Sequence, residues 1–164
     1  MSDPKDLFPR MPVEVFDLWI RPHIPDYGWP FSPTKPSVLG TRWYKFFTRQ
    51  PISYWATLYW RLDKIKIGQN SLAGDTWLRI QWVIGAVVFG QNTPTAQLED
   101  TSKRFWACAA LIKNHGDLPP IIGVATNAGF SVVDGHHRLA ALVHLGMADG
   151  HPISAWIGSP KRES

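Results

Sequence analysis

The sequence predicts an α/β fold, a small mixed β-sheet with packed helices, together with a Pro/Trp-rich N-terminal extension. Two observations predict it. From about residue 76 onward, short apolar runs alternate with helical segments, and this alternation favours a sheet with helices on it. Before that point prolines accumulate, since nine of the 14 lie in residues 1–70. They exclude one long helix or a central strand there.

We therefore divide the chain into three parts. Residues 1–70 form a Pro/Trp-rich arm with a basic helix, residues 71–160 form the core, and residues 161–164 are a tail. The range 21–36 holds five prolines, which predicts an extended, wrapping arm. Its rings at Trp19, Trp29 and Phe31 are too many to leave in water, so we expect the arm to pack on the core.

The first regular elements follow from apolar spacing. Ile52, Trp55, Tyr59 and Leu62 recur every three or four residues. That spacing predicts a helix that begins at Pro51 and ends before Gly68. Residues 78–88 are rich in β-branched side chains and predict a buried strand or a pair of strands, with a bend at Gly85.

The second half of the chain predicts a helix, a hairpin, a helix and a strand. Thr93-Pro94 is a good helix start, and apolar residues keep helical phase until Gly116. Residues 120–125 and 130–133 read as strands joined by a turn at 127–129. A helix over 136–145 ends at Gly146, and residues 153–157 form a last strand.

Composition limits the class of protein. A chain of 164 residues with 45% hydrophobic residues has enough apolar material for one core, which excludes global disorder. The single cysteine excludes an intrachain disulfide or a cysteine zinc site. The longest apolar run, 82–90, is about half the ~20 residues that a membrane span needs. We expect a cytoplasmic protein without a membrane span, whose net charge of +4 permits an anionic partner.

The sharpest motif is Asp-Gly-His-His-Arg at 134–138. It lies between a predicted strand and a predicted helix, where free backbone N–H groups and the positive end of the helix dipole meet. Gly135 lets the backbone approach a ligand closely, and His137 and Arg138 add donors, which predicts a phosphate site.

Each residue of the motif has a candidate role. Asp134 is a candidate Mg²⁺ ligand or base, a histidine is a candidate general base, and Arg138 would stabilise developing charge. The candidate catalytic residues are thus Asp134, His136, His137 and Arg138. A plainer interpretation stays open, in which Asp134 caps the helix, Gly135 makes the turn and the histidines are surface residues.

The segments around this motif resemble the core of the ParB/sulfiredoxin superfamily. The resemblance rests on Pro-Ile-Ile-Gly-Val at 120–124 and on Phe-Ser-Val-Val-Asp-Gly-His-His-Arg-Leu-Ala-Ala-Leu-Val-His-Leu-Gly at 130–146, and it covers roughly residues 77–158. It implies a ParB/sulfiredoxin-like fold that holds ATP and Mg²⁺ at Gly135, His137 and Arg138. Sulfiredoxins have a cysteine where His136 stands, and ParB partition proteins have Gly-Glu-Arg-Arg in this turn. The resemblance is therefore to the branch with Asp-Gly-His-His-Arg.

That branch includes free-serine kinases, proteins with ATPase or nuclease activity, and plasmid fertility-inhibition (oncogenic suppression) proteins. The resemblance implies an ATPase and DNase that inhibits the conjugative or type IV secretion-mediated transfer of a DNA–protein complex. The implied partners are a nucleotide, DNA and the secretion or conjugation machinery or its substrate protein.

A basic and aromatic stretch precedes the core. Residues 41–70 hold six Lys or Arg residues, one acidic residue and eight aromatic residues. Rings beside cations are typical of single-stranded nucleic-acid binding. On the predicted helix, Trp60, Arg61 and Lys64 lie away from the apolar face and are the candidate contacts. A solvated basic face is the alternative.

Two other functions stay open. In one, the phosphate site is inactive and the Trp-rich arm blocks a secretion or DNA-processing partner. In the other, the protein is a small-molecule kinase related to free-serine kinases. Such kinases use a distant glutamate as base, and only Glu14 precedes the predicted first core strand.

Overall fold

The structure is a computed structural model that describes residues 3–28, 41–68, 71–90, 95–115, 118–147 and 152–162. By its internal contacts the chain divides into two compact units. Unit 1 comprises Met1–Arg61 with Gly158–Ser164, and unit 2 comprises Leu62–Ile157. The boundaries fall inside strands β1 (Tyr59–Lys66) and β4 (Pro152–Ser159).

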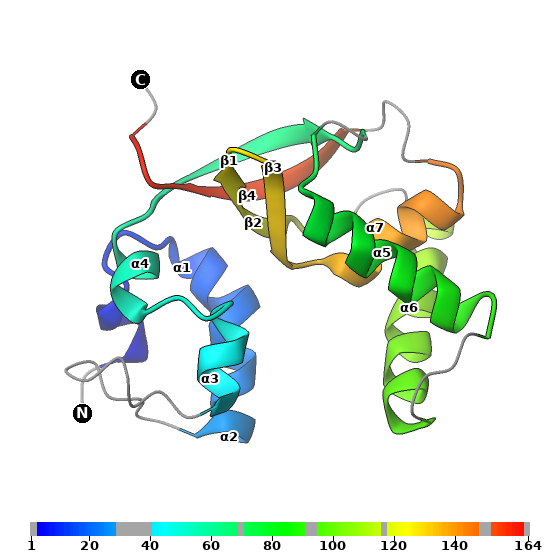
Figure 1. Cartoon of the computed structure of the whole chain (residues 1–164), viewed down its shortest axis with the longest axis horizontal. Coiled ribbons are helices and arrows are strands. Elements are labelled where there is room, and N and C mark those ends of the chain that lie inside the picture. The colour runs from blue at the N-terminus through cyan, green and yellow to red at the C-terminus, as the bar shows by residue number, and fades with distance from the viewer. Residues whose placement is uncertain are drawn as a thin grey trace. The chain divides into compact units, whose positions relative to one another are not determined.

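The fold is α/β, as predicted, with a four-stranded mixed sheet and packed helices. The strand order is β1-β4-β2-β3. Strands β2 (Ile121–Thr126) and β3 (Gly129–Asp134) form the predicted antiparallel hairpin, in which Val124 pairs with Ser131. Helices α5 (Gly74–Val87), α6 (Thr95–His115) and α7 (His136–His144) pack against one another in unit 2 (Figure 1).

The core of unit 2 is apolar and draws on every one of these helices. Its buried side chains include Ile80, Val83, Phe105, Ile112, Ile121, Leu139, Leu142 and Ile157. Helix α6 confirms a helix between Thr93-Pro94 and Gly116, and α7 and β4 confirm the predicted helix over 136–145 and the final strand. Thr93-Pro94 and Gly116, the predicted ends of the first of these helices, lie outside the described residues. No helix in the described ranges is long and apolar enough to cross a membrane.

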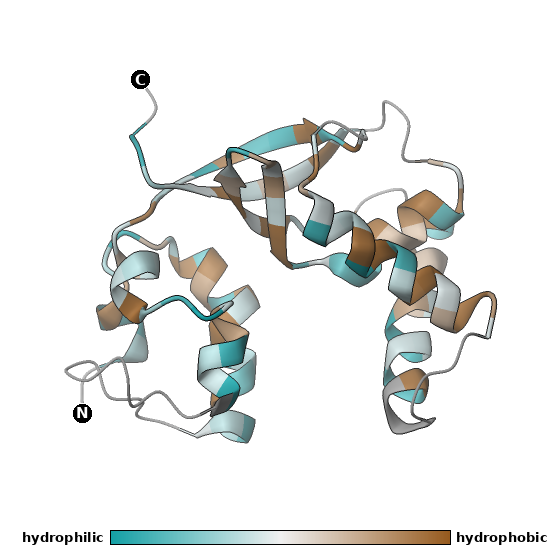
Figure 2. Cartoon of the chain, viewed as in Figure 1, coloured by the Kyte–Doolittle hydropathy of each residue, from teal (hydrophilic) through white to brown (hydrophobic). Residues whose placement is uncertain are grey.

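The prediction of strands over residues 78–88 is wrong, because this segment belongs to α5. Thr76, Ile80 and Val83 are buried at helical spacing, three or four residues apart. Packing of that face outweighs the modest preference of β-branched residues for strands. Figure 2 shows hydrophobic and hydrophilic residues alternating around the turns of α5.

The helix predicted from Pro51 is half right. Helix α4 (Ile52–Ala56) begins there, but it stops before Tyr59, where β1 starts. Leu62, expected on the apolar helix face, is 54% exposed on β1. A strand replaces the predicted helix because Tyr59 and Trp60, which are half-buried there, suit a sheet surface.

The described residues of unit 1 that precede β1 form short helices, so the prediction of an extended arm is wrong for residues 21–28. Residues 29–36 of that predicted arm lie outside the described residues. Two 3₁₀ helices (Pro4–Leu7 and Arg21–His23), a π-helical turn (Phe16–Ile20) and helices α1 (Val13–Val15), α2 (Ile24–Tyr27) and α3 (Thr41–Phe46) precede α4. Pro4, Pro22 and Pro25 each lie in the first turn of a helix. Proline is tolerated at that position because its missing N–H would have no helical acceptor.

An aromatic cluster holds these short helices together. Phe8, Phe16, Trp19, Phe47 and Trp55 are each at most 1% exposed, and the rings of Trp19 and Trp55 lie 4.9 Å apart. Trp29 and Phe31, which we also expected to be packed, lie outside the described residues.

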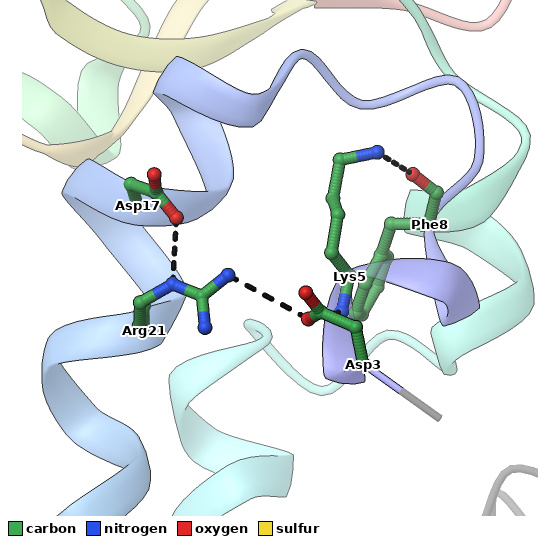
Figure 3. A network of polar contacts seen from close by, with 5 residues as sticks. All are labelled: Asp3, Lys5, Phe8, Asp17 and Arg21. Carbon is green, nitrogen blue, oxygen red and sulfur yellow. Dashed lines mark hydrogen bonds and ion pairs between the residues drawn. The ribbon is translucent and has the colours of Figure 1, made fainter. Parts of the chain in front are cut away.

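A polar network closes the N-terminal end of unit 1 (Figure 3). Arg21 Nε donates to Asp17 Oδ1 at 2.7 Å, and Arg21 Nη2 lies 3.6 Å from Asp3 Oδ1. Lys5 Nζ donates to the carbonyl oxygen of Phe8 at 3.0 Å. One guanidinium thereby pairs with both carboxylates.

Candidate functional site

The Asp-Gly-His-His-Arg motif forms the predicted strand–turn–helix. Strand β3 ends at Asp134, and α7 begins at His136. Gly135 between them has a φ of +118°, which side-chain-bearing residues rarely adopt. A Cβ at this position would lie 2.5 Å from Ile121 Cγ2. The glycine is therefore required for the close approach of α7 to β2, whatever binds at the turn.

Arg138 holds the turn against the chain that enters β2. Its Nη1 donates to the carbonyl oxygens of Pro119 and Pro120 at 3.0 and 2.7 Å. Its Nη2 forms an ion pair with Asp134 Oδ2 at 2.7 Å, and the two side chains are 15% and 31% exposed. The guanidinium that we expected to grip phosphate thus already bonds three oxygen atoms of the protein. These bonds position the motif, and they use three of the five N–H donors of Arg138.

The N-terminus of α7 carries no side-chain cap. Its first helical hydrogen bond runs from Leu139 N to Gly135 O at 3.0 Å. The backbone N–H groups of His136, His137 and Arg138 precede that bond and therefore lack helical acceptors. Asp134, which we considered as a cap, bonds Arg138 instead. The helix start keeps donors and a positive dipole end for an anion.

His136 is half-buried and uncharged at neutral pH. Burial, followed by Arg79 and His137, lowers the pKa of His136 from 6.5 to about 4, and Asp75 opposes them. A neutral imidazole has one N–H donor and one acceptor nitrogen.

His137 has a second, partly separate environment. Burial first, and then Arg104 and Arg79, lower the pKa of His137. Asp100 and Asp134 act in the opposite direction. On α6, Arg104 Nε pairs with Asp100 Oδ2 at 3.2 Å. This ion pair lies within electrostatic reach of the motif.

The sequence analysis did not identify Asp75 and Arg79 as site residues, because it assigned residues 78–88 to strands and not to a helix. Asp75 accepts a hydrogen bond from Ser131 Oγ at 2.9 Å, which joins the start of α5 to β3. Arg79 lies one turn further along α5 and is exposed. Its guanidinium lies 5.4 Å from the ring of Trp82 and forms no ion pair with another described residue. The spacing of four between Asp75 and Arg79 is the helical signal that would have identified them.

Few side chains that could bind a metal ion or act as a thiol lie near the motif. Within the described ranges, no group of three or more His, Cys, Asp or Glu side chains could hold a metal ion. A cation at Asp134 would therefore take most of its ligands from water and a bound phosphate. Burial raises the pKa of the Cys108 thiol on α6, and Arg138 opposes that effect.

The three predicted nucleic-acid contacts lie on β1. Because strand side chains alternate, Trp60 and Lys64 share one face and Arg61 lies on the other. Trp60 and Arg61 are half-buried, and the indole N–H of Trp60 is buried without a hydrogen-bond acceptor among the described residues. Only Lys64 is exposed. The strand thus separates three residues that the predicted helix would have brought together.

Comparison of the chain with protein-family models, with curated proteins and with solved structures found no match.

Proposed function

We propose that the first turn of α7 binds phosphate in a phosphoryl-transfer protein of the ParB/sulfiredoxin type, with ATPase and DNase activity. One observation carries this proposal. Two half-buried, uncharged histidines begin a helix whose N-terminus is uncapped, and Arg79 and Arg104 lie within electrostatic reach of them. This donor set fits an anion, because backbone N–H groups, imidazole N–H groups and guanidinium groups all donate hydrogen bonds.

The two histidines suit different roles. His136, with a pKa of about 4, holds no second proton near neutral pH and can donate one hydrogen bond to a phosphate oxygen. His137 has a lowered pKa and lies within electrostatic reach of Asp134 and Asp100, so its neutral form can accept the proton of an attacking water or hydroxyl. Arg104 and Arg138 each pair with a carboxylate, whereas Arg79 forms no ion pair with a described residue. Arg79 can therefore bind a phosphate without breaking an ion pair.

ATP and Mg²⁺ fit this site in part. Asp134 supplies one carboxylate, whose Oδ2 already faces Arg138. When bound, Mg²⁺ would neutralise phosphate charge during transfer. The residues of the chain would orient the phosphate, stabilise its charge and move the proton.

We further propose that the protein inhibits the conjugative or type IV secretion-mediated transfer of a DNA–protein complex, in the cytoplasm. The support is the resemblance around Asp-Gly-His-His-Arg. Nucleotide, DNA and a component of the transfer machinery are the partners that it implies.

Arg79→Gln and Arg104→Gln test the site better than Arg138→Ala does, because loss of Arg138 removes bonds that hold the turn. We expect each variant to lower kcat/KM for magnesium-dependent ATP hydrolysis and for DNA nicking by about 10- to 100-fold. Arg162→Gln, an exposed arginine of unit 1, is the matched control and should retain both activities.

A second readout does not need turnover. Phosphate bound beside a histidine favours its charged form, so inorganic phosphate should raise the pKa of His136 or His137 in an NMR titration. A folded wild type without either activity and without this pKa change would reject the proposal. The non-catalytic binding module would then be the better description.

A further inference from the structure

Unit 1 contains a basic surface that the proposed phosphate site does not use. Between Asp26 and Asp63 the sequence holds five Lys or Arg residues and no acidic residue. Arg42, Lys45 and Arg49 of this stretch lie on α3 or directly after it. Figure 2 shows hydrophilic residues on α3 and along the turn that follows it. Positive charge is therefore concentrated on one short helix and its turn.

We define the α3 surface as Arg42, Tyr44, Lys45 and Arg49. All four side chains are exposed, and Tyr44 is 45% exposed, which is unusual for a ring in a unit with an aromatic core. Its three cations form no ion pair with any described residue. Arg42 Nη1 donates to the carbonyl oxygen of Asp26 at 3.3 Å, and its guanidinium lies 5.8 Å from the centre of the Tyr27 ring.

Two carboxylates near the start of unit 1 are paired away from this surface. Asp3 and Asp17 both pair with Arg21 (Figure 3). Neither of them forms an ion pair with Arg42, Lys45 or Arg49.

A strained turn holds Arg49 beside Tyr44. Thr48 and Arg49 have φ values of +54° and +61°, and they are the two non-glycine residues with positive φ in the described ranges. Arg49 N donates to Tyr44 O at 2.8 Å. Buried Phe47 anchors the turn, since its carbonyl oxygen accepts the indole N–H of Trp55 at 3.1 Å. The packed cluster therefore maintains a left-handed conformation that side chains disfavour.

We propose that the α3 surface binds single-stranded nucleic acid. Arg42, Lys45 and Arg49 would neutralise successive phosphates, and the exposed ring of Tyr44 would stack on a base. None of the four side chains that define the α3 surface is aliphatic, the kind that inserts into a lipid bilayer. This proposal goes beyond the proposed hydrolysis, because binding here requires neither the α7 turn nor nucleotide.

The test is binding of a fluorescent oligo(dT) of about 20 nucleotides to the full chain, measured by anisotropy over a salt series without Mg²⁺ or nucleotide. Three phosphate contacts predict a slope of log K against log salt of about −2 for a single strand. The double variant Lys45→Gln, Arg49→Gln should bind at least about 10-fold more weakly and show a slope nearer about −0.7. Tyr44→Leu should weaken binding by about 5- to 10-fold without changing the slope, because it removes stacking and no charge.

Two controls separate this surface from general charge and from misfolding. Lys161→Gln, Arg162→Gln changes net charge by the same amount at exposed positions of unit 1 and should bind within about twofold of wild type. Arg49→Lys keeps the charge and should keep the slope. Circular dichroism of each variant should match that of the wild type.

Three results would overturn the proposal. The first is that the wild type does not bind oligo(dT) at about 50 mM salt. The second is that the Lys161→Gln, Arg162→Gln control loses as much affinity as the Lys45→Gln, Arg49→Gln variant. The third is that the protein binds a DNA duplex or phosphatidylserine vesicles as tightly as oligo(dT), or more tightly. Because the readout is binding alone, its failure leaves the proposed hydrolysis untouched, and failure of hydrolysis leaves this proposal standing.

Discussion

Gly135 is the residue on which the geometry of the α7 turn depends. A side chain at this position would be disfavoured twice, by the positive φ of the backbone and by a Cβ that would lie 2.5 Å from Ile121 Cγ2. We expect Gly135→Ala to lower the free energy of unfolding by about 2–4 kcal/mol. Gly146 is the matched control, because it has a φ of +70° with nothing within 4 Å. Gly146→Ala should cost only about 1 kcal/mol, the penalty for the backbone conformation alone.

Chemical denaturation of the two glycine variants measures the difference directly. Equal losses for Gly135→Ala and Gly146→Ala would show that Ile121 moves aside at little cost. The glycine would then be required for its backbone conformation only.

His136 makes stability depend on pH. Its pKa is 6.5 in the unfolded chain and about 4 in the folded protein, so between these values the unfolded chain binds a proton that the folded protein does not. Stability is therefore complete above the unfolded pKa and falls as the pH drops toward the folded pKa. For this group alone we expect a loss of about 2 kcal/mol between about pH 7 and pH 5.

Urea unfolding at several pH values checks this expectation, with His136→Gln as the comparison. The variant should lose less stability on acidification, although His137, whose pKa is also lowered, still contributes in the same direction. Identical pH dependence in both proteins would contradict the assignment.

At the scale of single elements, α5 shows how far a local pattern can mislead. Its valines and isoleucines favour a strand by propensity, yet Ile80, Val83 and Ala86 are buried along one helical face. Intrinsic preferences differ by less than about 1 kcal/mol per residue, whereas burying one large apolar side chain contributes about 1.5–3 kcal/mol. The misassignment also hid Arg79, a cation near the candidate site that forms no ion pair with another described residue.

The turn after α3 stores backbone strain at a β-branched residue. Thr48, with a φ of +54°, should tolerate glycine better than threonine, so we expect Thr48→Gly to raise the free energy of unfolding by about 0.5–1 kcal/mol. Thr57 has a φ of −97°, and the single proton of its hydroxyl group is shared between the carbonyl oxygens of Ser53 and Tyr54. Thr57→Gly should therefore destabilise the protein. Thermal denaturation distinguishes the two, and a loss of stability in Thr48→Gly would refute the strain argument.

On the scale of the whole molecule, each unit has buried apolar residues of its own. Trp19 is 1% exposed in the aromatic cluster of unit 1, whereas Trp82 is 37% exposed on α5. We expect Trp19→Ala to cost about 3–5 kcal/mol, with loss of amide protection confined to unit 1. Trp82→Ala should cost less than about 1 kcal/mol. Hydrogen exchange of α7 in the Trp19 variant is the decisive measurement, since equal loss of protection in both units would mean that they unfold as one.

The sequence by itself determined the α/β class, the hairpin of β2 and β3, the start of α7 and the glycine turn between them. These features depend on local signals, namely turn residues, helix starts and spacing within a few positions. The functional interpretation of the motif also came from the sequence, and it remains a proposal.

Only the tertiary structure decided which groups surround the motif and which are already engaged. Arg138 is bonded to residues 18 and 19 positions earlier, and Arg79 reaches the histidines from a helix more than 50 positions before them. The helices of unit 1 likewise depend on aromatic residues brought together from distant segments. These contacts join residues that are far apart in the sequence, and local sequence patterns do not specify which distant side chains meet when the elements pack.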